Sequence, residues 1–404
     1  MHPVASRILA RGRSALILAV LACASPAQAG GQFAAVGDMS TPRALHGAAP
    51  LPDGRVLVVG GIADFGIVLG SAELFDPASG TFALTGPLHD ARSRPTTVAL
   101  ADGRVLVFGG RGGEGGGTYF SDAEIYDPAS GQFSPGGDSG TPRYVATAAL
   151  LADGRVLIAG GFNRNDGALA SADLYDPATG TFTPTGSMSR PRIQTSAVVR
   201  LPDGRVLIVG GGNDDGPLAS AELYDPATGT FSETGSLPEP RAGHSLALLR
   251  DGRVLVVGGS DDGASGGNLV YYPVAQLYDP ASGTFTPTGS LAFARSMQTA
   301  TVLPDGRVLV AGGSYVAGQP GSVTVPTAEI YDPATGTFSS VGDTVVSRDE
   351  PVAVTLPGGR VLLAGGWAFA GDTVGDLPTE HAEVFTPALQ DAIFADGFEA
   401  VPLH

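Results

Sequence analysis

The chain contains no lysine and a single cysteine, Cys23. All 23 basic residues are arginine, and 40 aspartates and glutamates bring the net charge to -17. Such an acidic chain disfavours nucleic acid and anionic membranes as partners. Charged residues make up only 16% of the sequence, well below the roughly 25% usual in soluble domains, which excludes a coiled coil or other long-helix protein.

Long apolar runs are also scarce. Residues 15–24 form a run of about ten, where a membrane-spanning helix needs about 20, so no membrane span is expected. This run follows three arginines and precedes the Ala-Gln-Ala at residues 27–29, which is typical of a signal peptidase site. We therefore interpret residues 1–29 as an export signal and expect a periplasmic or extracellular protein. A lipoprotein anchored through Cys23 is the alternative.

Loss of residues 1–29 would remove the only cysteine. The mature chain would then contain no thiol, so neither disulfides nor cysteine chemistry are expected despite an oxidising destination.

Glycine and proline are abundant, with 60 and 31 copies, and they recur at a fixed spacing. An Asp-Gly-Arg-Val-Leu segment, Gly-Gly-Arg-Val-Leu in its last copy, returns every 48 to 54 residues. A segment of the type Ala-Glu-Leu-Tyr-Asp-Pro follows each copy, and a Gly-Thr-Phe segment follows most of those. Seven copies of such a unit indicate a repeat architecture.

Each unit predicts four antiparallel strands. In the second unit they are residues 96–101, 104–108, 123–126 and 132–134, with an Asp-Gly turn between the first two. No unit shows helical periodicity, which excludes a helical solenoid. The sequence therefore predicts an all-β, seven-bladed β-propeller of four-stranded blades.

The phase of the repeats predicts how the ring closes. Residues 32–36 form a fourth-strand signature ahead of the first full unit, whereas the last unit stops at a third strand, residues 382–385. We expect the N-terminal strand to complete the last blade, which would protect the open edges. The propeller then spans residues 30–387, residues 388–404 form a C-terminal tail, and the protein is expected to be a monomer.

These signatures together resemble the kelch repeat over residues 32–387: a glycine doublet after an apolar strand, Glu-x-Tyr-Asp-Pro, Gly-Thr-Phe and Pro-Arg. Phenylalanine stands where kelch repeats usually have tryptophan. The resemblance implies a ligand-binding face formed by the loops after the glycine doublets and the loops between fourth and first strands. Family members include adaptor proteins, a copper oxidase acting on galactose and a sialic-acid mutarotase.

One arginine ends each connection between a fourth and a first strand. The seven are Arg43, Arg92, Arg143, Arg192, Arg241, Arg295 and Arg348. One interpretation is structural pairing with the third-strand acids. The other is a collar of guanidinium groups that binds ligand carboxylates, because arginine suits bidentate recognition. Gln276 replaces the acid in the fifth unit, so Arg295 or its neighbour is expected to lack its usual partner.

The loops after the glycine doublets differ most between units, which is typical of a binding face. They carry aromatic residues among Asp and Asn, a combination that suits a sugar or a peptide. Anchoring of the loops against the blades is the alternative. The candidate ligand-binding aromatics are Trp367, Tyr315, Phe162 and Tyr271.

Evidence for a metal or cofactor is weak. The segments 165–167, 214–216 and 261–263 offer Asp and Asn oxygens that suit calcium, but ordinary turn chemistry explains them equally well. No histidines are spaced as paired metal ligands, although His46 and His244 share one repeat position. We predict no cofactor and leave calcium as an alternative.

Taken together, these patterns favour an exported binding scaffold for a carbohydrate or a protein or peptide. The first alternative is a periplasmic sugar-modifying enzyme of the mutarotase or epimerase type, since such a site needs only one or two acid-base groups. A surface or assembly protein is the second. Copper-radical oxidase chemistry is disfavoured, because in the family it implies a tyrosine cross-linked to a cysteine. No catalytic residue is assigned.

Overall fold

A computed structural model of the chain describes residues 30–388, except 114–116, 194–197, 262–268, 317–321 and 370–375. The predicted export signal with Cys23, and residues 389–404 of the predicted tail, lie outside the described residues. Within the described part, the structure is all β apart from two three-residue 3-10 turns, η1 (Asp64–Gly66) and η3 (Pro357–Gly359).

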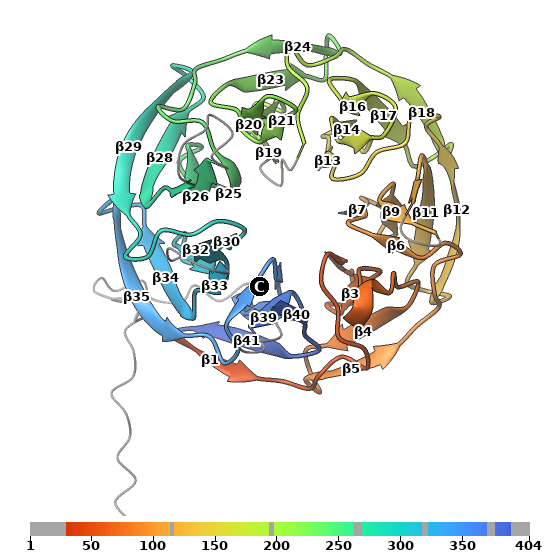
Figure 1. The fold of residues 1–404 in the computed structure, drawn as a ribbon, viewed down its shortest axis with the longest axis horizontal. Coiled ribbons are helices and arrows are strands. Elements are labelled where there is room, and N and C mark those ends of the chain that lie inside the picture. Colours follow the sequence, from red (N-terminus) through yellow and green to blue (C-terminus); the bar gives the residue numbers. More distant parts are fainter. Residues whose placement is uncertain are drawn as a thin grey trace, which may run out of the picture.

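Seven four-stranded antiparallel sheets, counted over the described residues, stand around a central axis as the blades of a propeller (Figure 1). In each blade the first strand of the unit lies innermost and the fourth lies outermost. The all-β propeller prediction is therefore confirmed.

The first four blades share one strand order, from the axis outward. Blade 1 has β2 (Gly47–Pro50), β3 (Val56–Val59), β4 (Ala72–Asp76) and β5 (Thr81–Leu84). Blade 2 has β7 (Thr96–Ala99), β8 (Val105–Phe108), β11 (Asp122–Asp127) and β12 (Gln132–Asp138). Blade 3 has β13 (Thr147–Leu150), β14 (Val156–Ala159), β17 (Ala172–Asp176) and β18 (Thr181–Pro184). Blade 4 has β19 (Val198–Arg200), β20 (Val206–Val209), β23 (Ala221–Asp225) and β24 (Thr230–Glu233).

The remaining three blades follow the same order. Blade 5 has β25 (Ala242–Leu248), β26 (Val254–Asp261), β28 (Val274–Asp279) and β29 (Thr284–Ser290), with β27 (Val270–Tyr271) added beside β26. Blade 6 has β30 (Thr299–Val302), β31 (Val308–Ala311), β34 (Thr327–Asp332) and β35 (Thr337–Asp343). Blade 7 has β37 (Val352–Thr355), β38 (Val361–Ala364), β41 (Ala382–Pro387) and β1 (Gly31–Ala35).

The N-terminal strand closes the ring. β1 pairs antiparallel with β41, from Gly31 opposite Pro387 to Ala35 opposite Glu383. The first described strand of the chain thus becomes the outer strand of the last blade, as the phase of the repeats predicted.

The core consists of seven apolar clusters, each between two neighbouring blades of the described ring. The second strand is buried along its whole length in six blades, as in β8, where all four residues are buried, and in blade 5 the first six residues of β26 are buried. These strands are continuous apolar runs because both of their faces pack against neighbouring blades.

A hydroxyl pair joins neighbouring blades at four junctions of the described ring, as where Thr85 Oγ1 and Tyr126 OH lie 2.8 Å apart. At the two junctions of blade 7, both partners are apolar instead. Val36 and Phe75 belong to one cluster there, and Val341 and Phe385 belong to the other. At these two junctions both positions change together, whereas at the junction of blades 2 and 3 Gly136 replaces the threonine and Tyr175 keeps its hydroxyl.

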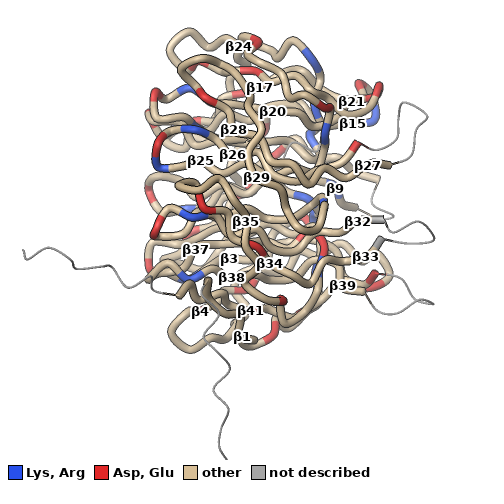
Figure 2. The backbone as a smooth tube through the Cα atoms, turned by 90° about the vertical axis from the view of Figure 1, so that its left-hand side faces the viewer, with Lys and Arg blue, Asp and Glu red and all other residues tan. Residues whose placement is uncertain are grey.

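The two ends of the ring differ. Figure 2 shows short hairpins gathered at one end, which we call the hairpin face. Their strands are β6 (Arg92–Ser93), β9 (Arg111–Gly112), β10 (Thr118–Tyr119), β15 (Phe162–Asn163), β16 (Gly167–Ala168), β21 (Gly212–Asn213), β22 (Gly216–Pro217), β32 (Ser314–Val316), β33 (Ser322–Thr324), β36 (Arg348–Asp349), β39 (Trp367–Phe369) and β40 (Asp376–Pro378). The Asp-Gly-Arg turns lie at the other end.

The glycine doublets allow the chain to turn onto the hairpin face. In blade 1, Gly60 and Gly61 have φ of 67° and 97°, and a Cβ on Gly60 would lie 2.5 Å from the carbonyl oxygen of Arg92. Both a left-handed backbone and a close approach thus require glycine here.

Candidate functional site

The seven repeat arginines hold their own blades together. Their side chains are 0 to 1% exposed, and six of them pair with the acid on the third strand of the same blade. The N–O distances are 2.7 Å for Arg43–Glu73, 3.0 Å for Arg92–Glu124, 2.7 Å for Arg143–Asp173, 2.9 Å for Arg192–Glu222, 2.8 Å for Arg295–Glu329 and 2.8 Å for Arg348–Glu383.

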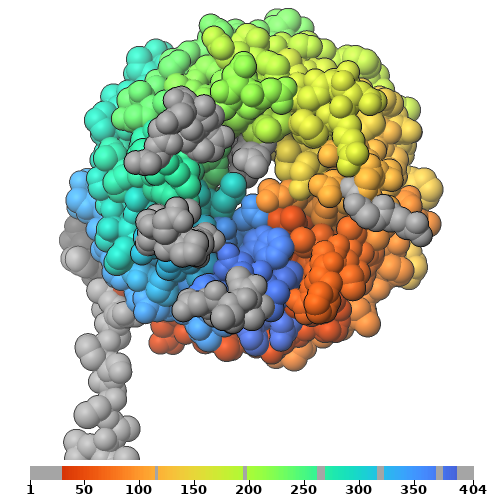
Figure 3. All heavy atoms as spheres, in the orientation of Figure 1, coloured from red at the N-terminus to blue at the C-terminus, as the bar shows by residue number. Residues whose placement is uncertain are grey.

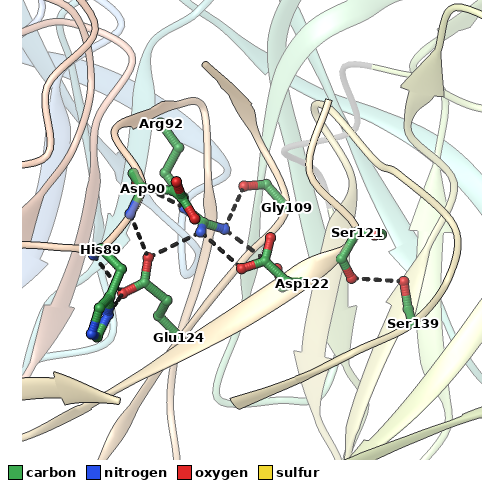
Figure 4. A network of polar contacts seen from close by, with 8 residues as sticks. All are labelled: His89, Asp90, Arg92, Gly109, Ser121, Asp122, Glu124 and Ser139. Atoms are coloured by element: carbon green, nitrogen blue, oxygen red, sulfur yellow. Dashed lines mark hydrogen bonds and ion pairs between the residues drawn. The ribbon is translucent and has the colours of Figure 1, made fainter. Parts of the chain in front are cut away.

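Figure 4 shows this arrangement in blade 2. Arg92 donates to both Asp122 and Glu124 and to the carbonyl oxygen of Gly109. The other oxygen of Glu124 accepts the backbone N–H of His89 at 2.9 Å. The acid thus fixes the arginine and the connection that precedes it.

This burial corrects the expectation of a guanidinium collar. A ligand carboxylate cannot reach a guanidinium that is buried and already paired inside its blade. The structural interpretation of Arg43, Arg92, Arg143, Arg192, Arg241, Arg295 and Arg348 replaces it.

Blade 5 departs from the pattern, and the arginine affected is Arg241 rather than Arg295. Arg241 pairs with Glu239 at 3.0 Å, and its guanidinium lies 4.6 Å from the ring centre of Tyr272. Gln276 fills the place of the acid. In four other blades, as in blade 2, the third-strand acid accepts the backbone N–H of the residue three positions before the repeat arginine. In blade 5 this residue is Pro238, which has no N–H to donate. The acid and the N–H that it would accept are therefore lost together.

A cavity of about 410 Å³ opens on the axis of the ring. Figure 3 views the ring along this axis and shows the hollow at its centre. Ten of the fifteen lining residues follow a repeat arginine by two or three positions, and the others follow by four or five. Two positions on are Leu45, Arg94, Val145, Met297 and Glu350; three positions on are His46, Pro95, Ala146, Gln298 and Pro351.

The first of these positions has a strained backbone. The five described non-glycine residues there have φ between 46° and 58°, in the left-handed region. Such conformations cost of order 1–3 kcal/mol each and cluster at functional sites. Neighbouring connections bond to one another here, because Arg94 N–H donates to the Leu45 carbonyl at 2.7 Å. The strain aims five different side chains at the axial opening.

Two of these side chains form an ion pair across the opening. Arg94 Nη2 lies 2.5 Å from Glu350 Oε1, and the two side chains are 25% and 15% exposed. Arg94 precedes blade 2 and Glu350 precedes blade 7, so the pair spans the position of blade 1. Trp367 Nε1 donates to Glu350 Oε2 at 3.3 Å. Burial opposes the charge on Arg94, but Glu350 holds the pKa of Arg94 above its ordinary value.

Asp349 lies beside this pair. Burial, together with the charge of Glu350, raises the pKa of Asp349 to about 7. The hydroxyl of Ser314 donates to Asp349 Oδ2 at 3.0 Å and partly offsets the shift. This carboxyl group therefore exchanges its proton near neutral pH.

Aromatic side chains lie on the hairpins around the mouth. Tyr119 contacts Tyr144 edge to face, with ring centres 6.0 Å apart, and lies 5.9 Å from Phe162. Burial raises the pKa of the Tyr144 hydroxyl, and Arg94 opposes that shift. These rings pack against one another, as loop anchoring predicts.

The predicted aromatics are therefore spread over four blades. Trp367 lies on β39 against Glu350, and Phe162 lies on β15 against Tyr119. Tyr315 lies on β32 and Tyr271 on β27, both partly exposed on the hairpin face. Trp367 is the one of the four that contacts a charged residue of the axial mouth.

Carboxylate oxygens of the candidate calcium segments accept hydrogen bonds from the protein. Asp166 Oδ2 accepts from the Asn163 side-chain amide at 3.1 Å, and Asp214 Oδ2 accepts the N–H of Ala168 at 3.3 Å. Asp262 and Gly263 lie outside the described residues. Across the part of the chain that the structure describes, no three His, Cys, Asp or Glu side chains are grouped to hold a metal ion.

Sequence reasoning missed Arg94, Asp349 and Glu350. Arg94 is one of the six arginines of residues 30–404 that belong to neither repeated set. A charged residue at a position that is uncharged in five of the seven units was the signal that could have revealed it. For Glu350 the same comparison applies.

No helix among the described residues is long and apolar enough to cross a bilayer.

Comparison with known proteins agrees with this architecture. A family model of the KLHDC2/KLHL20/DRC7 kelch-repeats domain matches residues 97–313. Two galactose oxidases of Gibberella zeae are 36% identical over 109 residues, which is 26% of this chain. The matched segment spans only 15% of the oxidases' own length.

Two solved structures share the fold. A fungal alcohol oxidase of the AA5 family, in complex with copper, has a TM-score of 0.67 and 18% identity, covering 89% of this chain and 76% of that one. The structure of YjhT has a TM-score of 0.59 and 15% identity, covering 76% of this chain and 99% of that one. At these identities the likeness concerns the fold alone.

Copper, which the alcohol oxidase holds, does not fit the residues of this chain. Copper prefers imidazole and thiolate ligands. His46 and His244 lie in blades 1 and 5, and among the described residues no three His, Cys, Asp or Glu side chains are grouped to hold a metal ion. The charged residues at the axial mouth include a guanidinium, which repels a cation. The matched repeats and the seven-bladed ring nonetheless establish the family: the chain belongs to the kelch-repeat family, among the kelch and galactose-oxidase-like β-propellers.

Proposed function

We propose that the chain is an exported binding protein that takes a carbohydrate at the axial mouth of the hairpin face. The observation that carries this proposal is the cross-ring pair of Arg94 and Glu350, supported by Trp367 and Asp349. Arg94 and Glu350 depart from the repeat and both line one cavity. Trp367 and Asp349 each hydrogen-bond to Glu350. Repeat units that are alike where they pack against one another but differ at one opening indicate a binding site at that opening.

The cavity suits a small polar ligand. Its volume of about 410 Å³ lies within the usual range for small-molecule sites. Charged and amide groups line part of it, and Leu45, Val145 and Met297 line another part. Sugars present hydroxyl groups at their edges and C–H groups on their faces. The polar part of the cavity wall can therefore contact the hydroxyl groups, and the apolar part can contact the C–H groups.

The surface around the mouth supports contact with a larger glycan. Apart from Leu84, the exposed large apolar residues of the described chain lie in the connections at the hairpin face. They are Phe65, Ile67, Leu269, Val270, Val274, Phe293, Val323, Val345, Phe369 and Leu377. Phe65 is 99% exposed. A face with so many exposed apolar groups is typical of an interaction surface.

The relatives point the same way. Galactose oxidase, by its name, acts on a sugar, and part of its chain is 36% identical to this one. A protein or peptide ligand on the same face is the other form of the binding proposal, and short peptides therefore belong in the panel of ligands that tests it.

A second candidate function rests on Asp349. A carboxyl group with a pKa near 7 suits acid-base catalysis at neutral pH, as a sugar-isomerising enzyme would need. Exchange between the anomers of a reducing sugar, followed by NMR, tests this. Faster exchange with the wild type than with Asp349→Asn supports it, and equal rates contradict it.

The binding proposal is tested by the unfolding midpoint of the protein with a panel of neutral sugars, acidic sugars and short peptides. A ligand that binds only the folded state stabilises it by about 2.7 kcal/mol at a hundredfold excess over Kd. We expect a shift with sugars that is lost in Trp367→Ala. Arg104→Ala is the control, because Arg104 pairs with Asp102 on the opposite face. A shift with peptides alone would contradict the carbohydrate assignment.

A further inference from the structure

We infer that the axial mouth recognises two neighbouring hydroxyl groups of a neutral sugar, held between Arg94 and Glu350. This inference rests on the proposed carbohydrate binding and specifies its ligand. It concerns the one described ion pair that joins two blades across the opening.

The geometry sets this pair apart from the repeat pairs. Repeat arginines pair with acids of their own blade and are buried. Arg94 and Glu350 instead come from blades 2 and 7, at the same position of their units, with φ of 46° and 49°. Both side chains line the cavity and keep a share of their surface exposed. A ligand in the cavity therefore meets both groups at once.

Both groups keep hydrogen-bonding capacity. A guanidinium has five N–H donors, and within the described residues Glu350 is the one side chain to which Arg94 donates. Glu350 accepts from Arg94 and Trp367, and a carboxylate has about four acceptor sites. A hydroxyl group both donates and accepts. Two adjacent hydroxyls can therefore accept from Arg94 and donate to Glu350.

The local charge favours a neutral ligand. Glu350 already neutralises Arg94, and Asp349 adds a second carboxyl group beside it. A ligand carboxylate would approach two acids and one guanidinium, so like-charge repulsion opposes it. The ligand class is thus opposite to the one that a free arginine collar would select.

The other members of the same repeat position complete the site. Leu45, Val145 and Met297 are apolar and line the same cavity. They provide contact for the C–H face of a sugar ring whose hydroxyl edge lies at the ion pair.

The experiment measures Kd by calorimetry for the full chain with methyl galactoside, methyl glucoside and methyl mannoside. Each is compared with its 2-deoxy, 3-deoxy and 4-deoxy forms and with its uronic acid. Loss of one hydroxyl of the bound pair is expected to weaken binding about tenfold or more, because the bond involves a charged group. The uronic acid is expected to bind more weakly than the neutral sugar. Arg94→Gln and Glu350→Gln should each weaken binding similarly, whereas Arg104→Ala should not.

The double variant Arg94→Gln with Glu350→Gln guards against misfolding, because it leaves no unpaired charge. It should keep the wild-type unfolding midpoint without ligand and still bind weakly. Tighter binding of the uronic acid, or equal binding of all deoxy forms, would overturn the inference but leave carbohydrate binding intact. Absence of binding by every sugar would overturn the proposed function together with it.

Discussion

Arg348 shows what the repeat requires of a single residue. Its guanidinium is fully buried and donates to Glu383 Oε1 at 2.8 Å and to three backbone carbonyls, at Val346, Gly365 and His381. Burying an ion is costly unless its partners compensate for the lost water. Four partners do so here, and pairing with a third-strand acid recurs in five of the other six blades.

Removal of the acid that pairs with Arg348 should therefore strongly destabilise the folded protein. Glu383→Gln would leave Arg348 buried without a counter-charge, and we expect a loss of about 3–5 kcal/mol in the free energy of unfolding. Asp153→Asn is the matched comparison, since Asp153 and Arg155 pair with both side chains exposed, at 45% and 37%; its loss should stay below about 1 kcal/mol. Urea unfolding of both variants checks this. Equal losses would show that burial does not set the strength of these pairs.

The pKa of Asp349 predicts a pH dependence. Its folded value of about 7 lies above the ordinary 3.8, so the folded state holds the proton more tightly than the unfolded state. Asp349 therefore lowers stability as the pH rises from about 4 to about 7, by at most about 4 kcal/mol, and its effect is constant above that range. Asp349→Asn should be more stable than the wild type at pH 8 and no more stable at pH 4. A stability difference that does not vary with pH would contradict the assignment.

At this scale the sequence located the repeat arginines and their acids but not their role. Both the collar and the pairing interpretation fitted the spacing, because spacing does not say whether a side chain turns into its blade or into the opening. Arg94 and Glu350 were missed for a different reason. Their partnership joins units 256 residues apart in the chain, and no repeat pattern connects them.

At the scale of elements, strands and turns followed from composition and period. The fourth-strand signature ahead of the first unit predicted the pairing of β1 with β41. The hairpins of the hairpin face, such as β9 with β10, were not predicted. Their sequences are short and irregular, and their pairing depends on the neighbouring connections that they contact.

The junctions of blade 7 offer an element-scale prediction. Phe385→Tyr would place a hydroxyl group beside Val341 in an apolar cluster, at an expected cost of about 1–3 kcal/mol. Val341→Thr should restore the hydroxyl pair that Thr85 and Tyr126 form elsewhere.

A double-mutant cycle measured by urea unfolding tests this coupling. The combined variant should be more stable than the sum of the two single losses predicts, by about 0.5–3 kcal/mol. Simple additivity would show that the two positions do not interact.

At the scale of the whole molecule, the ring separates structure from function. Between the blades, the seven units repeat their apolar clusters and arginine pairs and thereby build a rigid scaffold. At the hairpin face they differ, and two of the charged differences, Arg94 and Glu350, form an ion pair at the axial mouth. The fold could be predicted from the sequence because it is repeated seven times, whereas the site could not, because each of its residues occurs once.

Hydrogen-deuterium exchange of the full chain, with and without saturating methyl galactoside or whichever panel sugar binds more tightly, tests the central claim most directly. Carbohydrate binding at the axial mouth predicts slower exchange in the connections around Arg94 and Glu350 and in β39, with no change in the Asp-Gly-Arg turns at the other end. Protection confined to those turns, or no protection with any sugar, would contradict it.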